Sequence, residues 1–499
     1  MGCLNYTDLL FNHSSNDAAI QQDSQVLSYE ELNVRIFNMV QYLRSVGIHK
    51  NDHVAIKIND RLQYIVIFLA LWKMDATIIP IDSQVNAQNL SDMLHDADCI
   101  FFITESHDRI SKKYIETCLK SEEARVVELN HAELLLVTLA DSKPDNHCSW
   151  IEHMGLPKDQ GYMMLYTSGT SGKVKGVLLR KASLINNIKK VIAYTELTKE
   201  DSILLTLPLS YSLAISQMLA HLIVGGKVVL TDQAKSSLEI LQQIKLHQVT
   251  NYASTPYFYE NITKTIQYVN EDFLHNHVRF FMNAGGYVSK YTIEEYMKLF
   301  PQAAFYNNYG QTEASSRLCY NKITGPDCGA DHVGIPLQGV DICIFDDNGN
   351  PLEKNSIGEI GFISEDMMVG YYKQSVLNRE EYFLTGDLGY INPEDKLVIV
   401  GRKDSMIKIN GRKVYKNDIE DQLQALSFVQ AAKFKKEVHP SLGEYFVVYV
   451  ILKAGVEEEK AISDIYTFCK KRFNKYIIPK KIIHCNEFAL TSNHKVKIQ

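Results

Sequence analysis

The most informative segment of the chain is Tyr166-Thr167-Ser168-Gly169-Thr170-Ser171-Gly172-Lys173-Val174-Lys175-Gly176, which follows the apolar stretch Tyr162–Leu165. Its glycines let successive backbone N–H groups converge on an anion, and its hydroxyls add donors. The lysines supply positive charge for a polyphosphate. The spacing differs from that of a Walker A loop, GxxxxGK[ST]. The segment therefore indicates a phosphate-binding loop behind a buried strand, with an ordinary surface loop as the alternative.

Helical and strand patterns alternate on both sides of this loop. Ser28 and Glu31 form a predicted capping box, and apolar residues then recur at helical spacing as far as Gly47. Further strands are predicted at Val54–Ile58, Thr77–Ile81, Ile203–Thr206 and Lys227–Thr231, and helices at Arg61–Met74, Ile215–Val224 and Leu238–His247. This alternation predicts an α/β fold.

The last hundred residues have a different pattern. Lys396–Val400 and Met406–Ile409 are interpreted as a strand pair around Gly401-Arg402-Lys403-Asp404. They are followed by a predicted helix, strand and amphipathic helix at Asp418–Leu426, Tyr445–Leu452 and Glu457–Tyr476. We therefore expect a large N-terminal α/β domain over residues 1–403 and a small, mobile C-terminal α+β domain over residues 404–499.

Composition excludes several classes of protein. The 499 residues carry 52 Lys and Arg against 59 Asp and Glu, a net charge of −7, which gives no electrostatic signature of a nucleic-acid partner. The best apolar run, Ile65–Trp72, is shorter than the ~20 residues of a transmembrane segment. The nine cysteines form no CxxC pair or zinc pattern. With no secretory signal, we expect a cytoplasmic protein with reduced thiols.

Four more segments carry groups suited to nucleotide chemistry. In Asn307-Asn308-Tyr309-Gly310-Gln311-Thr312-Glu313, the tyrosine is suited to stack on a base and the glutamate to bind Mg²⁺ beside phosphates. In Thr385-Gly386-Asp387, the carboxylate is suited to accept ribose hydroxyls. The others are Gly401–Asp404 with the following Lys408 and Gly411, and Thr491-Ser492-Asn493-His494-Lys495. Singly, each of the four is typical of a turn.

In this order and spacing, the five segments resemble the core motifs of the adenylate-forming superfamily: acyl-CoA synthetases, adenylation enzymes and luciferases. YTSGTSGKVKG is similar to the signature loop YTSGTTGxPKG, and NYGQTE, TGD and GRKDxxIKxxG match further motifs. Ile478-Pro479 and LTSNHKV resemble the terminal VP…LTxNGKV stretch, with His494 in place of glycine. The resemblance covers nearly the whole chain.

The resemblance implies a role for each matching residue. Lys495, Thr312 and Lys175 would be catalytic, and Glu313 would bind Mg²⁺. The ATP and AMP contacts would come from Thr167, Ser168, Gly169, Thr170, Ser171, Gly172, Lys175, Gly285, Gly286, Asn307, Asn308, Tyr309, Gly310, Thr312, Asp387, Arg402 and Lys495. The acyl pocket would be lined by Tyr211, Ser212, Ser216, Ala284 and Gly285. Asp404 would be the hinge, and Lys408 and Gly411 would line the thiol tunnel.

The implied reaction begins with ATP and a small carboxylic acid, and releases pyrophosphate. A thiol, from CoA or from the phosphopantetheine of a carrier protein, then displaces AMP. Ser212 stands where amino-acid-activating relatives carry an aspartate, and an unpaired buried ammonium is costly. We therefore expect an acyl, aryl or hydroxy acid, unless another acidic residue pairs the ammonium.

The alternatives are a free-standing adenylation enzyme that loads a carrier protein and a non-catalytic nucleotide-binding relative. Luciferase-type oxidation is disfavoured. The chain ends just past the terminal motif, so no fused carrier domain is expected.

Overall fold

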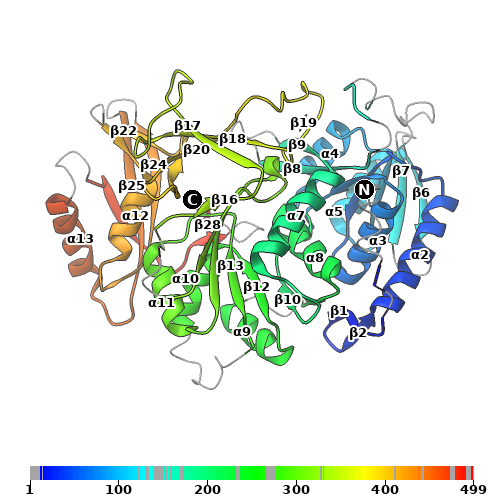
Figure 1. The fold of residues 1–499 in the computed structure, drawn as a ribbon, viewed down its shortest axis with the longest axis horizontal. Coiled ribbons are helices and arrows are strands. Elements are labelled where there is room, and N and C mark those ends of the chain that lie inside the picture. The colour runs from blue at the N-terminus through cyan, green and yellow to red at the C-terminus, as the bar shows by residue number, and fades with distance from the viewer. Residues whose placement is uncertain are drawn as a thin grey trace. The chain divides into compact units, whose positions relative to one another are not determined.

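The computed structural model describes most of the chain, as two compact units (Figure 1). The first unit comprises residues 1–253, 310–317 and 364–379, and the second comprises residues 254–309, 318–363 and 380–499. The residues described are 12–13, 15–120, 124–129, 134–139, 151, 154–157, 160–168, 174–231, 236–265, 277–325, 329, 331–409, 412–439, 443–472, 478–490 and 496–497.

Two sheets make up the framework of the first unit. One is eight-stranded, in the order β19 (Gly370–Tyr371), β9 (Val174–Arg180), β8 (Tyr162–Ser168), β4 (Thr77–Pro80), β3 (His53–Lys57), β5 (Phe101–Glu105), β7 (Leu134–Leu139) and β6 (Ala124–Leu129). The other runs β12 (Asn251–Ser254), β10 (Ser202–Leu205), β11 (Lys227–Leu230), β1 (Ala18–Gln22) and β2 (Gln25–Ser28). The strands predicted in this region are confirmed to within a residue at each end.

Seven described helices accompany these sheets: α2 (Tyr29–Ser45), α3 (Arg61–Lys73), α4 (Ala87–Asp96), α5 (Arg109–Lys120), α7 (Lys181–Thr195), α8 (Ser212–Val224) and α9 (Ser237–Leu246). The capping box at the start of α2 is confirmed, because Ser28 and Glu31 each accept from the other's backbone N–H. Helix α3 is buried on all sides from Tyr64 to Trp72, which explains its continuous apolar sequence.

Helix α8 begins three residues before the predicted start at Ile215. The cause is burial, because Leu213 to Leu222 are all buried and no amphipathic stripe marks the first turn. The helix ends at Gly225, whose φ of +80° provides the left-handed cap. The difference matters because the earlier start places Ser212, a predicted acyl-pocket residue, inside the helix.

Before residue 404, the described part of the second unit contains two sets of four strands and two helices, α10 (Pro256–Thr265) and α11 (Lys290–Leu299). One set of strands is β13 (Phe280–Asn283), β14 (Ala304–Tyr309), β15 (Cys319–Ile323) and β16 (Ile335–Pro336). The other sheet has the order β17 (Val340–Phe345), β18 (Gly358–Ser364), β20 (Phe383–Ile391) and β21 (Leu397–Arg402).

The C-terminal part of this unit has a hydrophobic core of its own, which runs from Ile407 to Ile482. Its elements are β22 (Ile407–Ile409), β23 (Arg412–Val414), α12 (Lys416–Gln424), β24 (Val429–His439), β25 (Gly443–Leu452), α13 (Glu458–Arg472), β26 (Lys481–His484), β27 (Ala489–Leu490) and β28 (Val496–Lys497). A separate core is what a small domain needs, and the boundary at 403/404 stays a prediction.

The predicted pairing of the strands on either side of Gly401–Asp404 is wrong. Strand β21 pairs with β20, and β22 pairs with β23. Each strand therefore takes an antiparallel partner outside the pair that the sequence suggested. The predicted α/β class is nevertheless confirmed.

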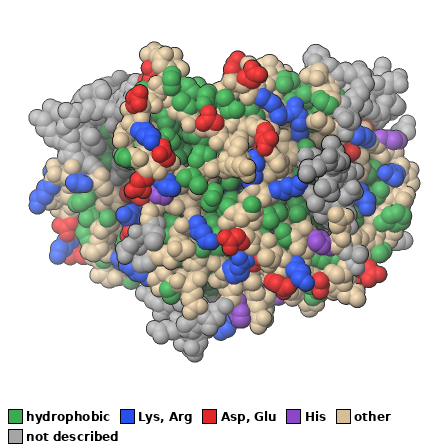
Figure 2. Space-filling model, in the orientation of Figure 1, with side chains coloured by type: hydrophobic (Ala, Val, Ile, Leu, Met, Phe, Trp, Pro, Cys, Tyr) green, Lys and Arg blue, Asp and Glu red, His purple; other side chains and the backbone are tan. Residues whose placement is uncertain are grey.

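No helix in the described part of the chain is both long and apolar enough to cross a bilayer. Figure 2 shows Lys and Arg side chains interspersed with Asp and Glu over the face in view. The mixture fits the small net charge of −7.

Candidate active site

The candidate phosphate loop joins two antiparallel strands, β8 and β9, of the first unit. Thr167 is opposite Lys175 in this pair, and Ser168 is opposite Val174. Gly169, Thr170, Ser171 and Gly172 lie outside the described residues. The ammonium of Lys175 lies 4.8 Å from the ring centroid of Tyr371. The strand pair thus brings the predicted lysine alongside a tyrosine that lies outside the five sequence motifs.

The candidate metal ligand, Glu313, lies in a short 3₁₀ turn, Thr312–Ala314. The hydroxyl of Tyr371 donates to Glu313 Oε1 at 2.9 Å. The backbone is held as well, because Met368 N–H donates to the Glu313 carbonyl at 2.7 Å. Within the first unit, one tyrosine therefore contacts both the predicted metal carboxylate and the predicted phosphate lysine.

The chain after Glu313 is held in an unusual conformation. Ser315 and Ser316 have φ values of +55° and +100°, and both residues are buried. Ser315 Oγ donates to the Asp366 carbonyl at 2.5 Å, and Asn187 Nδ2 donates to the Arg317 carbonyl at 2.9 Å. Left-handed φ at a residue other than glycine costs about 1–3 kcal/mol and persists only where surrounding contacts impose it. These contacts fix the turn that carries Thr312 and Glu313.

A second group of predicted residues meets within the second unit. Tyr309 ends β14, and its hydroxyl donates to Asp387 Oδ2 at 2.7 Å. Arg402 Nη1 lies 3.0 Å from the other oxygen, Asp387 Oδ1. Burial raises the pKa of the Asp387 carboxyl, against the opposing effect of the Arg402 charge. The predicted base-stacking and ribose-binding residues therefore form one hydrogen-bonded set.

The predicted adenine-slot segments also adjoin in this unit. Strands β13 and β14 are parallel neighbours, so Gly285 and Gly286 follow one strand end beside Asn307 and Asn308 in the next strand. Asn283 Nδ2 links them, because it donates to the Gly286 carbonyl and to Asn307 Oδ1 at 3.2 and 3.1 Å. Carboxyl ends of parallel strands are the usual place for ligands in such sheets.

The predicted acyl-pocket residues Tyr211, Ser212 and Ser216 lie at the start of α8, while Ala284 and Gly285 belong to the second unit. Tyr211 donates its hydroxyl to Asp82 Oδ2 at 3.0 Å. Neither Tyr211–Ser216 nor Asn283–Tyr287 contains an acidic residue. Asp82 comes from just beyond β4, and only its hydrogen bond to Tyr211 in the folded chain reveals it.

The remaining predicted residues belong to the C-terminal part of the chain. Asp404 is exposed, and its Oδ1 lies 3.8 Å from Arg402 Nε. Lys408 lies in β22 opposite Lys413. Gly411, His494 and Lys495 lie outside the described residues.

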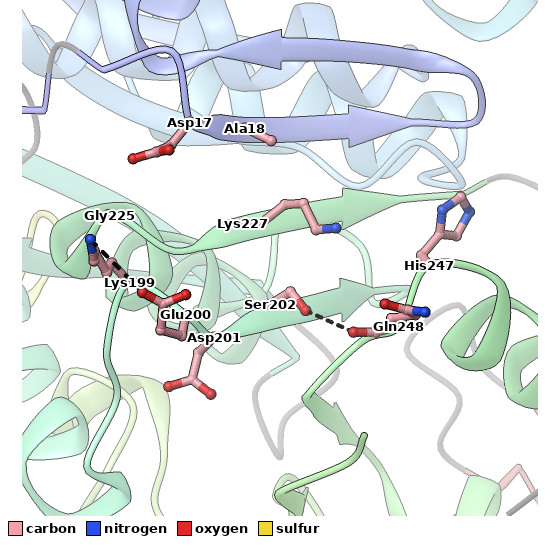
Figure 3. Close-up of a pocket in the computed structure, with 10 residues that line it drawn as sticks. All are labelled: Asp17, Ala18, Lys199, Glu200, Asp201, Ser202, Gly225, Lys227, His247 and Gln248. Atoms are coloured by element: carbon pink, nitrogen blue, oxygen red, sulfur yellow. Dashed lines mark hydrogen bonds and ion pairs between the residues drawn. The ribbon is translucent and has the colours of Figure 1, made fainter. Parts of the chain in front are cut away.

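A polar cavity of about 290 Å³ in the first unit is a different feature (Figure 3). It lies at the amino ends of β1, β10 and β11, where Ala18, Ser202 and Lys227 begin the strands. Ligands of parallel sheets bind at the opposite, carboxyl ends. None of the predicted site residues lines this cavity.

Comparison with known proteins defines the class. The family model described as "AMP-binding enzyme" matches residues 11–372, and the chain belongs to this family. This agrees with the resemblance of the sequence motifs to the adenylate-forming superfamily.

Two relatives illustrate the different kinds of protein to which the chain is similar. The chain is 24% identical over 503 residues to tyrocidine synthase 3 of Brevibacillus parabrevis, covering 97% of this chain but only 7% of that protein. It is 25% identical over 463 residues to oxalate–CoA ligase of Arabidopsis thaliana, covering 90% of this chain and 88% of the relative.

Solved structures share the fold. ATP-bound MatB of Rhodopseudomonas palustris has a TM-score of 0.82 and 21% identity, with 99% of this chain and 97% of that chain covered. A benzoate CoA ligase of Burkholderia xenovorans LB400 also has a TM-score of 0.82, at 18% identity, with 99% of both chains covered.

Proposed function

We propose that the protein adenylates a carboxylic acid that lacks an α-ammonium group and then transfers the acyl group to a thiol. The observation that carries the proposal is the contact of Tyr371 with both Lys175 and Glu313. An ammonium and a carboxylate that contact the same tyrosine suit a magnesium polyphosphate, because one group can bind the anion and the other its counter-ion.

The first half-reaction needs these groups for a clear reason. A carboxylate is a poor electrophile, since its leaving group would be oxide. Its attack on the α-phosphorus of ATP forms an acyl-adenylate and expels pyrophosphate. Negative charge accumulates at phosphorus, where Thr312, Lys175 and Lys495 would stabilise it. Lys495 would also hold the two anions together.

Glu313 fits the chemistry of a magnesium ligand. The described residues contain no group of three or more His, Cys, Asp or Glu side chains that could hold a metal without help. Mg²⁺ commonly uses one or two carboxylates together with substrate phosphates. The ion would neutralise phosphate charge. Glu313 would orient it from the turn fixed by Ser315 and Asn187.

The nucleoside would be held by the second unit. Asp387 would accept the ribose hydroxyls, with Arg402 compensating its charge and Tyr309 limiting its rotation. Gly285, Gly286, Asn307 and Asn308 would line the adenine slot, and Asp404 would act as the hinge between the half-reactions.

Ser212 is the reason for proposing a carboxylic acid without an α-ammonium group. An α-ammonium at this position would lose its hydration and gain only a hydroxyl dipole. One observation favours an α-amino acid instead, because Asp82 lies next to Tyr211. Both Asp82 oxygens accept hydrogen bonds, from Tyr211 and from the Gln84 backbone at 2.8 Å. Asp82 therefore already has a structural role in holding Tyr211.

A pyrophosphate-release screen over fatty, aryl, hydroxy and amino acids tests the acid class. We expect a non-amino acid to give the highest rate. Ser212→Asp should depress that rate by introducing an uncompensated anion, and it should admit α-amino acids. If the unmodified enzyme prefers an α-amino acid and Asp82→Asn abolishes that preference, Asp82 pairs the ammonium and our acid class is wrong.

The acceptor is tested in the same way. CoA and a phosphopantetheinylated carrier protein are offered separately to enzyme that holds the acyl-adenylate. We favour CoA by analogy with oxalate–CoA ligase of Arabidopsis thaliana, to which the chain is 25% identical over 463 residues. Transfer to the carrier protein alone would reverse that choice.

A further inference from the structure

Tyr371 belongs to none of the motifs that define the family resemblance, yet it lies between two of them. It ends the two-residue strand β19, whose partner β9 carries Lys175. Its neighbours are anchored on both sides, because Met368 N–H donates to the Glu313 carbonyl and Tyr372 N–H donates to the Gly176 carbonyl at 2.8 Å. The backbone of Tyr371 therefore has little freedom to shift.

The side chain of Tyr371 uses two different surfaces. Its hydroxyl donates to Glu313 Oε1 at 2.9 Å, and its ring lies 4.8 Å from the Lys175 ammonium. Among the described residues, Tyr371 is the only hydrogen-bond donor to the Glu313 side chain. A carboxylate that accepts on one oxygen keeps the other available for a cation. An ammonium above an aromatic ring is held without being neutralised.

We propose that Tyr371 is a positioning residue that orients the Glu313 carboxylate for Mg²⁺ and holds Lys175 ready for the phosphates. The proposal rests on the roles assigned to Glu313 and Lys175 in the proposed function. Lys175 and Glu313 use different parts of the same tyrosine, because the ammonium lies by the ring and the carboxylate accepts from the hydroxyl.

The two contacts predict separable effects. Tyr371→Phe removes the hydroxyl and keeps the ring, so the Glu313 carboxylate should lose its orientation while Lys175 keeps its partner. The Mg²⁺ concentration needed for half-maximal nucleotide binding should rise roughly 10-fold, the effect of losing a hydrogen bond to a charged group. Tyr371→Leu removes both contacts and should also weaken metal-free binding about 2–5-fold.

The experiment is calorimetry with α,β-methylene-ATP, which cannot transfer its adenylyl group because the α,β bridge is a methylene, measured across a Mg²⁺ titration and in chelator. Tyr372→Phe is the matched control. Its hydroxyl donates to Asp98 at 2.9 Å and not to Glu313, so its Mg²⁺ requirement should equal that of the unmodified protein. Glu313→Gln is measured in parallel. The double variant Glu313→Gln/Tyr371→Phe should need no more Mg²⁺ than Glu313→Gln alone.

The outcomes separate this inference from the proposed function. A raised Mg²⁺ requirement in Glu313→Gln with none in Tyr371→Phe overturns the positioning role and leaves the metal assignment standing. An unchanged requirement in Glu313→Gln overturns the metal assignment itself. An additive double variant also overturns the inference, because the two residues would then act independently.

Discussion

Gly310 offers the sharpest test of the geometry around the candidate metal ligand. A Cβ at this position would lie 2.1 Å from the Ser316 carbonyl oxygen and 2.8 Å from Arg317 Cα. Both neighbours are backbone, so no side chain can rotate away. Restoring a tolerable contact of 3.0 Å requires a shift of about 0.9 Å in the turn that carries Thr312 and Glu313.

The turn cannot absorb that shift without cost. Ser315 and Ser316 already have positive φ, and hydrogen bonds from Ser315 and Asn187 hold the turn. We expect Gly310→Ala to cost about 1–3 kcal/mol in the free energy of unfolding, as overpacking does. If this turn carries the proposed site, its displacement should also lower the adenylation rate roughly 100-fold, since misplacement by ~1 Å has that effect.

The assay is acid-dependent pyrophosphate–ATP exchange, with thermal unfolding measured on the same samples. Gly47→Ala is the control, because Gly47 has φ of +93° and no heavy atom within 4 Å of its added Cβ. It should cost about 1–2 kcal/mol through backbone strain alone and leave exchange unchanged. A folded Gly310→Ala variant with full exchange activity would refute the reasoning.

Three further outcomes are expected. Lys495→Ala should lower pyrophosphate release roughly 100-fold or more while thioester formation from supplied acyl-adenylate largely survives, and equal losses would contradict its role in adenylation alone. Asp387→Asn should weaken ATP binding about 10-fold. The unmodified protein should lose ATP affinity as the pH falls through the raised Asp387 pKa, and calorimetry of Asp387→Asn should show no such loss. Burial lowers the pKa of Lys181 from 10.5 to about 7. Between these values the unfolded chain binds one more proton than the folded chain, so the unfolding free energy rises with pH by at most about 1.4 kcal/mol per unit. Denaturant unfolding of Lys181→Met should lack this contribution, and an identical pH slope in both proteins would contradict the assignment.

Helices and strands were predicted correctly where capping residues or apolar periodicity within the element itself mark them. The capping box at Ser28 and the strands of the first unit were predictable because hydrogen bonding and alternation are local properties. The start of α8 was not, because a wholly buried helix has no polar face to mark its first turn. The partners of β21 and β22 were also missed, because strand pairing depends on residues distant in the chain.

The sequence by itself determined the family, and it indicated the chemistry that we propose. A phosphate loop, a metal carboxylate or a ribose acceptor requires particular residue types at short spacings. Such short motifs, and their order along the chain, can be read directly from the sequence. Only the tertiary structure decided which side chains share a partner. Tyr371 lies 58 residues from Glu313 in the chain, and Asp82 lies 129 residues from Tyr211. No periodicity encodes such contacts, because they arise where strands and helices pack together after the chain has folded.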